Sequence, residues 1–242
     1  MLLSKYDGDT ERSVVELIDL RSFEVKKTWR PDIKQINSLV DNSRPEFEYI
    51  QIDRHAKRYL MFHPFLTEDG GLIFQDDGTP LVKIDKNSQL VWQNQENVFH
   101  HSIEQDHEGN LWVPSQVYPF QIDKKYVGLN PGYKDDAITK VSPDGEILFQ
   151  KSVSEILLAN NMEYLLFQTG QVFNDDPIHL NDIEIIKKTS HLKYFDNVNI
   201  GDFLISLRNI NTILLIDHKT KEIKWSYENE LIMQHSPQIT DK

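Results

Sequence analysis

The sequence feature that most constrains the fold is a hairpin plan that recurs four times along the chain. Each copy has a short apolar segment, a turn of polar residues and a second segment that ends near an aromatic residue. The four copies lie at residues 14–29, 81–92, 138–149 and 213–225. Two short extended segments joined by turn-forming residues are typical of a β-hairpin. We therefore expect a chain built from antiparallel β-sheet.

A second kind of hairpin lies between these copies. Residues 63–74 and 101–113 resemble each other, and in both a His stands eight residues before a Gly at which the chain turns. Residues 234–242 begin the same element and stop one residue short of where that Gly would fall, so we expect the chain to be cut within a hairpin. Two alternating hairpins give roughly four strands in about forty residues, the period of a β-propeller blade.

The fold class is therefore predicted as all-β, a partial β-propeller with about four to five blades of four-stranded antiparallel sheet. We expect one incomplete propeller domain over residues 1–242, because no Pro-, Gly- or Ser-rich linker divides the chain. Residues 117–136 and 189–199 are expected as loops, and the only helix signal lies near residues 154–160.

Composition excludes several classes of function. The chain has no Cys, which excludes disulfides, thiolate catalysis and cysteine metal sites. Its formal net charge of -12 disfavours binding to nucleic acid or to an anionic membrane, because both need clustered Lys and Arg. No apolar run is long enough to span a membrane, and the first ten residues lack the order of a secretion signal.

The stretch Asp176–Asp182 carries the clearest candidate site residues. Pro177 would lead into a short strand on which His179 and Asn181 stand two positions apart and so share one face. Ile178 and Leu180 would face the opposite way, into a packed layer.

Four histidines occupy related positions in the repeats: His63, His101, His179 and His235. His100 directly precedes His101 in the sequence and is a further candidate. The innermost strand of each propeller blade lines the central channel, so residues at matching positions would converge on one axis. Histidines at strand ends also lock blades together through hydrogen bonds, and for His63, followed by Pro64, we expect that structural role.

Arg208 is the candidate anion-binding residue. It closes the apolar segment that follows the His179 strand, and Ser206, two positions earlier, would share its face. The two strands are expected to pair. The guanidinium group is a planar fork of donors that suits sulfate, phosphate or carboxylate.

Five segments together resemble the arylsulfate sulfotransferase family of β-propeller proteins. They are Phe99–Ile103, Ile178–Ile183, Leu204–Arg208, Ile213–Trp225 and Gln234–Ser236. The resemblance covers the chain from about residue 81 to its end, and it implies a complete ring of about six blades. It also implies transfer of a sulfuryl group from a phenolic sulfate ester to a phenol, without a nucleotide donor, through a transiently sulfated histidine.

The resemblance assigns roles to individual residues. It implies that His235 is the sulfated histidine and that His179 and Asn181 form the His-x-Asn pair. It also implies that Arg208 binds the anion and that His101 is the histidine that assists the reaction. His100, one position earlier, is the alternative match for this assisting histidine. Ser206 is a further substrate-binding candidate. An unperturbed imidazole, with a pKa of about 6.5, is largely neutral near pH 7 and can act as a nucleophile.

The resemblance implies small-molecule partners, an aryl sulfate donor and a phenolic acceptor, and no cofactor or metal. It also suggests a periplasmic or extracytoplasmic location. Two alternatives remain open. One is a non-catalytic propeller that binds an anionic ligand or a protein in its channel. The other is a metal-dependent hydrolase or lyase that uses the same histidines as ligands, although Arg208 would repel a metal cation.

Overall fold

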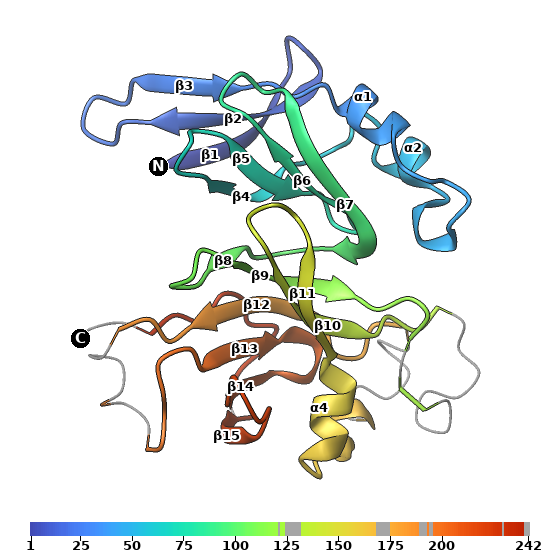
Figure 1. Ribbon diagram of the computed structural model, residues 1–242, viewed down its shortest axis with the longest axis vertical. Coiled ribbons are helices and arrows are strands. Elements are labelled where there is room, and N and C mark those ends of the chain that lie inside the picture. Colours follow the sequence, from blue (N-terminus) through green and yellow to red (C-terminus); the bar gives the residue numbers. More distant parts are fainter. Residues whose placement is uncertain are drawn as a thin grey trace. The chain divides into compact units, whose positions relative to one another are not determined.

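The computed structural model describes residues 1–120, 122–123, 132–167, 175–188, 193, 196–228 and 230–239. The chain forms two compact units: Met1–Ile103 with Asp144–Glu146, and Glu104–Pro143 with Ile147–Lys242. Short antiparallel strands dominate both units (Figure 1), which confirms the all-β prediction. The expected loops at 117–136 and 189–199 lie partly outside the described residues. The number of blades and the single propeller domain stay predictions.

The first unit contains two groups of antiparallel strands. β1 (Leu2–Asp7), β2 (Arg12–Ile18) and β3 (Val25–Trp29) pair in chain order, and so do β4 (Phe62–Leu66), β5 (Leu72–Gln75), β6 (Thr79–Ile84) and β7 (Leu90–Phe99). The core of this unit contains Val15, Trp29, Tyr59, Met61, Leu72, Phe74, Val82 and Ile84, all at most 2 % exposed.

Between β3 and β4 the chain forms short helices that the sequence analysis missed. They are α1 (Ile33–Ser38), the 3-10 turn η1 (Pro45–Phe47) and α2 (Ile50–Asp53). Asp32 caps α1 by accepting a hydrogen bond from the amide of Gln35. The expectation of a single helix was wrong here, because elements of one or two turns are too short to show a 3.6-residue apolar period.

The second unit contains two further groups of antiparallel strands. β8 (Glu104–Gln105), β9 (Leu111–Gln116), β10 (Asp136–Val141) and β11 (Ile147–Ser152) pair in chain order. β12 (Leu180–Ile185), β13 (Phe203–Leu207), β14 (Thr212–Ile216) and β15 (Ile223–Tyr227) do the same. Helix α4 (Val153–Ala159) confirms the predicted helix, and the described part of the unit also contains the 3-10 turns η2 (Glu163–Phe167) and η4 (Arg208–Ile210).

All four predicted hairpins are confirmed as β2–β3, β6–β7, β10–β11 and β14–β15. Three of their turns begin with an Asp whose carboxylate accepts a hydrogen bond from the backbone amide two residues later. The three acceptors are Asp19, Asp85 and Asp217, at 2.8, 2.7 and 2.8 Å. This bond mimics a backbone turn, so the position of Asp fixes where the chain reverses.

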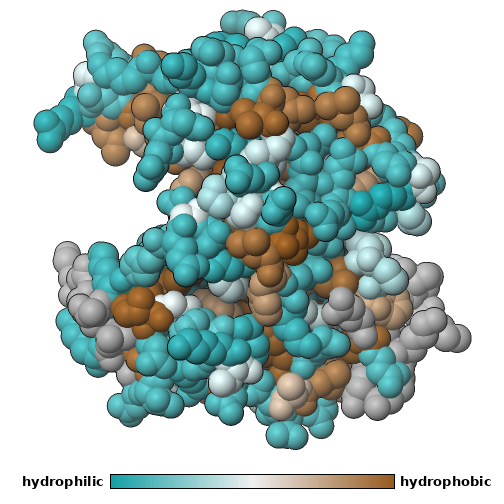
Figure 2. All heavy atoms as spheres, in the orientation of Figure 1, coloured by the Kyte–Doolittle hydropathy of each residue, from teal (hydrophilic) through white to brown (hydrophobic). Residues whose placement is uncertain are grey.

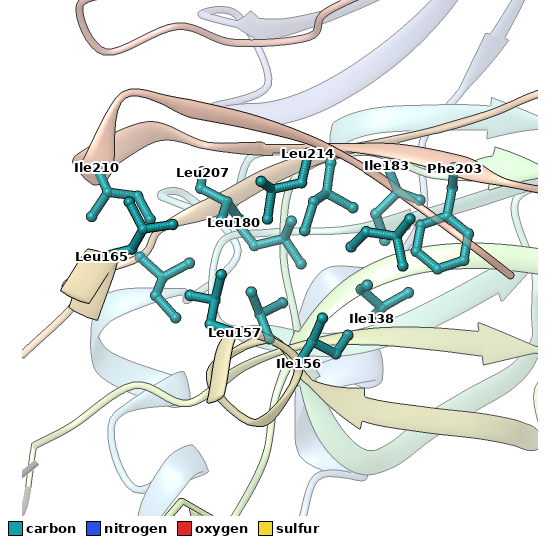
Figure 3. Close-up of a cluster of buried hydrophobic side chains, with 14 of the residues drawn as sticks. Ile138, Ile156, Leu157, Leu165, Leu180, Ile183, Phe203, Leu207, Ile210 and Leu214 are labelled. Carbon is teal, nitrogen blue, oxygen red and sulfur yellow. The ribbon is translucent and has the colours of Figure 1, made fainter. Parts of the chain in front are cut away.

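The core of the second unit lies where β12, β13 and β14 meet α4 and η2 (Figure 3). Leu180, Ile183, Phe203, Leu207 and Leu214 are all at most 1 % exposed, and Ile156 and Leu157 of α4 pack against the same cluster. Each fully buried side chain of this size stabilises the fold by about 1.5–3 kcal/mol relative to an exposed one. This packing fixes the beginning of β12 and the end of β13, where the site residues follow. No helix in the described part is long and apolar enough to cross a membrane.

Candidate active site

Three of the four repeated histidines share an unusual backbone conformation. His63, His101 and His179 have φ angles of 40°, 58° and 54°. Residues other than Gly adopt this left-handed region rarely, and His is one of the types enriched there. In the fourth repeat the positive φ, 48°, belongs to Ser236 and not to His235. His63, His101 and His179 thus share a left-handed backbone conformation as well as their related places in the sequence repeats.

His179 lies just outside its strand, which corrects the sequence prediction. β12 begins at Leu180, and its register with β13 shifts between Leu180 and Asp182, so Asn181 sits at an irregularity. His179 and Asn181 are therefore not alternate residues of a regular strand. Ile178 and Leu180 are both fully buried, as predicted. The Nδ1 atom of His179 lies 2.6 Å from Oδ2 of Asp176, which holds the ring.

Arg208 also lies just beyond its predicted strand. β13 ends at Leu207, and Arg208 begins the turn η4, so the regular Ser206/Arg208 alternation is not present. The predicted pairing of β12 with β13 is confirmed, and the Arg208 amide donates to the His179 carbonyl at 3.0 Å. The guanidinium donates through Nη1 to Oδ1 of Asn209 at 2.7 Å, and its Nη2 lies 3.6 Å from Sδ of Met233.

The segment around His235 comes to the same place. The Met233 amide donates to Oδ1 of Asn211, and the Gln234 carbonyl accepts from Nδ2 of Asn181 at 2.7 Å. One ring nitrogen of His235 lies within 4.8 Å of one of His179. The His235 side chain is exposed, and its Nδ1 lies 3.2 Å from the Met233 carbonyl.

The structure thus brings together five of the predicted site residues within the second unit: His179, Asn181, Ser206, Arg208 and His235. Ser206 is fully buried, and its hydroxyl accepts from Nε2 of Gln234 at 3.3 Å. Arg208 supplies the positive charge of this group, and the two imidazoles supply nitrogen lone pairs or N–H donors. Such a set can bind an oxyanion and offer it a nucleophile.

Asn181 is held by the segment that carries His235, and its predicted role in binding the substrate stays a prediction. It is 1 % exposed, and its Nδ2 is used by the Gln234 carbonyl. Its Oδ1 has no hydrogen-bond partner among the described residues. A carbonyl partner fixes which end of the amide carries the NH2 group, so the atom left over is an acceptor. As held, Asn181 supports the His235 segment, and its leftover oxygen is buried.

His100 and His101 belong to the first unit, where they form a pair. Their Nδ1 atoms lie 2.9 Å apart, and their rings are perpendicular, with centroids 5.1 Å apart. His100 is 3 % exposed, and the His101 carbonyl accepts from Nε2 of Gln75 at 2.6 Å. One Nδ1 must donate and the other accept, so the pair shares one proton at this contact. Their predicted role in the site stays a prediction.

Three residues that the sequence analysis did not single out hold the site residues in place. Asp176 contacts His179, Gln234 precedes His235, and Asn209 connects Arg208 to Asp176, because its Nδ2 donates to the Asp176 carbonyl at 2.6 Å. Asp176, Asn209 and Gln234 stand within three residues of a predicted site residue. Asp176 and Gln234 also fall within segments that the sequence analysis named, whereas the bond from Asn209 to Asp176 joins residues 33 positions apart and has no local signal.

A second cluster of possible metal ligands lies elsewhere in this unit. Asp202, Asp217 and His218 each offer a ligand atom, and these atoms lie within 4.8 Å of one another. The ammonium group of Lys224 already contacts both carboxylates, at 2.7 and 2.8 Å. The arrangement is that of an ion-pair network around Lys224, whose charge occupies the position a cation would take.

The fold and the site define an all-β protein with consecutive antiparallel strand groups and a site of histidine, asparagine and arginine. A family model described as arylsulfotransferase (ASST) matches residues 63–242. The match covers most of the chain, and the chain belongs to this family, as the resemblance predicted. No curated protein matches the sequence.

The solved structures that match are distant. A streptogramin B lyase is 12% identical with a TM-score of 0.43, over 95% of this chain and 51% of that one. A catalytically inactive H270A virginiamycin B lyase from Staphylococcus aureus, solved with quinupristin, is 11% identical with a TM-score of 0.38, over 72% and 42%. A protein of unknown function from Bacteroides caccae is 11% identical with a TM-score of 0.38, over 70% and 46%. The chain spans about half the length of these proteins.

Proposed function

We propose that the protein is an aryl sulfate sulfotransferase that moves a sulfuryl group from a phenolic sulfate ester to a phenolic acceptor. The observation that carries the proposal is the approach of His235 to His179 beside Arg208, in a chain of the arylsulfotransferase family. The class of reaction, sulfuryl transfer, is taken from the family. We add the proposal that the donor is an aryl sulfate, that the acceptor is a phenol and that His235 carries the sulfuryl group between them.

In the proposed first step, a ring nitrogen of His235 attacks the sulfur of the donor. The S–N bond forms, the S–O bond to the phenol breaks, and His101 gives a proton to the departing phenolate. Arg208 and His179 bind the sulfuryl oxygens as their charge redistributes, and positioning with electrostatic stabilisation supplies most of the catalysis.

In the second step, the acceptor phenol attacks the sulfur of the sulfated His235. His101 takes the proton of the acceptor, the S–O bond forms, and the S–N bond breaks, which restores the free histidine. Two steps that share one covalent intermediate predict ping-pong kinetics. His100 orients His101, while Asn181 and Ser206 hold the His235 segment.

Replacement of His235 with Ala tests this proposal. The purified chain is incubated with 4-nitrophenyl sulfate, with and without phenol, while nitrophenolate release and intact mass are recorded. Release that depends on the acceptor should fall by on the order of 10⁴-fold or more in His235→Ala, because the proposed covalent intermediate forms on the His235 ring. The mass gain of one SO3 group should also disappear. His55→Ala in the first unit is the control and should behave as the wild type.

Two results would contradict the proposal. Absence of release with any phenolic acceptor would favour the alternative, a non-catalytic protein that binds an anionic ligand through Arg208. Stoichiometric transition metal that survives dialysis would favour a metal-dependent hydrolase or lyase with histidine ligands. An extracytoplasmic location also belongs to the proposal, and fractionation of the source cells would test it.

A further inference from the structure

His235 is placed by a segment that has no regular structure of its own. Residues 230–239 form neither helix nor strand, and both Met233 and Ser236 have a positive φ, at 51° and 48°. A nucleophile must be held within about 0.5 Å of its productive position for efficient reaction. The order of this segment must therefore come from contacts with the surrounding sheet.

The side chain of Gln234 supplies three of these contacts. Its Nε2 lies 3.2 Å from the Leu207 carbonyl, 3.0 Å from the Thr212 carbonyl and 3.3 Å from the Ser206 hydroxyl. Leu207 and Thr212 face each other in the last pair of the β13–β14 ladder. The amide of Gln234 thus occupies the end of this ladder. Because two of its partners are carbonyl oxygens, only an N–H donor fits there.

The backbone of Gln234 is held as well. Its carbonyl accepts from Nδ2 of Asn181 at 2.7 Å and lies 3.5 Å from the Ser206 hydroxyl. Asn181 is 1 % exposed and Ser206 is fully buried, so both partners are fixed within the sheet. Side chain and backbone together connect the residue before His235 to β12, β13 and β14.

We propose that Gln234 is the positioning residue of the site, which holds the His235 imidazole close to His179. The inference rests on the proposed function, since it concerns the placement of the proposed nucleophile. Gln234 does not touch the substrate. It acts through the segment it anchors, and Asn181 and Ser206 act with it.

The test compares Gln234→Glu with Gln238→Glu. The first substitution replaces an N–H donor with a carboxylate that faces two carbonyl oxygens, while it keeps the size of the side chain. The second makes the same charge change on an exposed residue of the same segment. Hydrogen exchange over residues 233–239, thermal unfolding, and kcat and KM with 4-nitrophenyl sulfate and phenol are measured for both.

Gln234→Glu should speed exchange in residues 233–239, including the Met233 amide that donates to Asn211, and leave exchange in the rest of the chain unchanged. Its kcat should fall on the order of 10²-fold, because a misplaced reacting group loses rate even when binding persists. Its KM for the donor should stay within about threefold, since Arg208 is not altered. Gln238→Glu should match the wild type in all these measurements.

The exchange measurement separates this inference from the proposed function. If the wild type has no transferase activity, faster local exchange in Gln234→Glu still supports the anchoring role, while the proposed function fails. If exchange over 233–239 is the same in Gln234→Glu and Gln238→Glu, the inference is wrong whatever the activity. Gln234→Met repeats the comparison without a charge. Loss of protection throughout the chain in both Gln234 variants would overturn the inference, because Gln234 would then be required for folding.

Discussion

At the scale of single residues, Lys224 is the centre of a buried ion-pair network in the second unit. Asp202 is fully buried, and it also accepts from Nδ1 of His218 at 2.9 Å. Burial would raise the pKa of Asp202, but hydrogen bonds from Lys224 and His218 outweigh it, so the pKa lies below the usual value. Because the folded state depresses this pKa, the ionised carboxylate stabilises the fold above pH 3.8, and this contribution is lost as the pH falls through the folded pKa.

We expect Lys224→Met to destabilise the protein by about 3 kcal/mol at pH 7, because removal of one partner leaves a buried charge uncompensated. Urea unfolding measures the difference. Lys219→Met, in the exposed turn of the same hairpin, is the control and should change stability by less than about 0.5 kcal/mol. The effect of Lys224→Met should shrink as the pH is lowered below the unfolded pKa of Asp202. An equal loss in both variants would contradict the role given to the network.

At the scale of elements, the β4–β5 hairpin depends on two consecutive glycines with different roles. Gly70 has a φ of 81° and turns the chain, whereas a Cβ at Gly71 would lie 2.2 Å from the Ile84 carbonyl. The sequence analysis gave the turning role to the Gly eight residues after His63, which is Gly71, and that assignment was wrong. In the matching hairpin, Gly109 stands eight residues after His101 and has a φ of 84°. Gly is required at position 71 because the backbone carbonyl of Ile84 comes too close to admit a Cβ. A local sequence pattern does not predict such an approach.

We expect Gly71→Ala to destabilise the protein by about 2–3 kcal/mol, because the backbone of β6 must shift to admit the methyl group. Gly8→Ala is the matched control, since nothing lies within 4 Å of a Cβ built there. Chemical denaturation of both variants gives the two free energies of unfolding. Similar stability of Gly71→Ala and Gly8→Ala would show that the β5–β6 pair accommodates the methyl group without cost.

At the scale of the whole molecule, each unit has a hydrophobic core of its own, and the net charge is strongly negative. Figure 2 shows that hydrophilic side chains cover most of the visible face, with scattered apolar patches between them. A net charge of -12 repels anions, so an anionic aryl sulfate would approach Arg208 against the field of the protein.

We therefore expect kcat/KM for an aryl sulfate donor to rise about two- to threefold as ionic strength increases from about 10 mM to about 150 mM. Salt shortens the screening length from about 30 Å to about 8 Å and weakens the long-range repulsion. The same parameter for a neutral phenolic acceptor is the internal control and should stay constant. A fall for the donor would show that the field of Arg208 and nearby cations, and not the net charge, governs its approach.

The sequence by itself determined the four hairpins, the helix α4, the pairing of β12 with β13 and the burial of Ile178 and Leu180. These features follow from residues close together in the chain: an Asp that turns the backbone, and apolar residues that alternate along a strand. It also indicated the family and the site residues that the second unit brings together, because the short motifs that carry the resemblance occur in the expected order along the chain.

Only the tertiary structure decided how those residues are held. Asn181 donates to a carbonyl 53 residues away, and Gln234 reaches acceptors 22 to 28 residues away. The pairing of β12 with β13 ends at Leu180 and Leu207. His179 and Arg208 therefore lie just outside their strands. A local pattern encodes backbone conformation, whereas a hydrogen bond between distant segments depends on how the packed sheets bring them together.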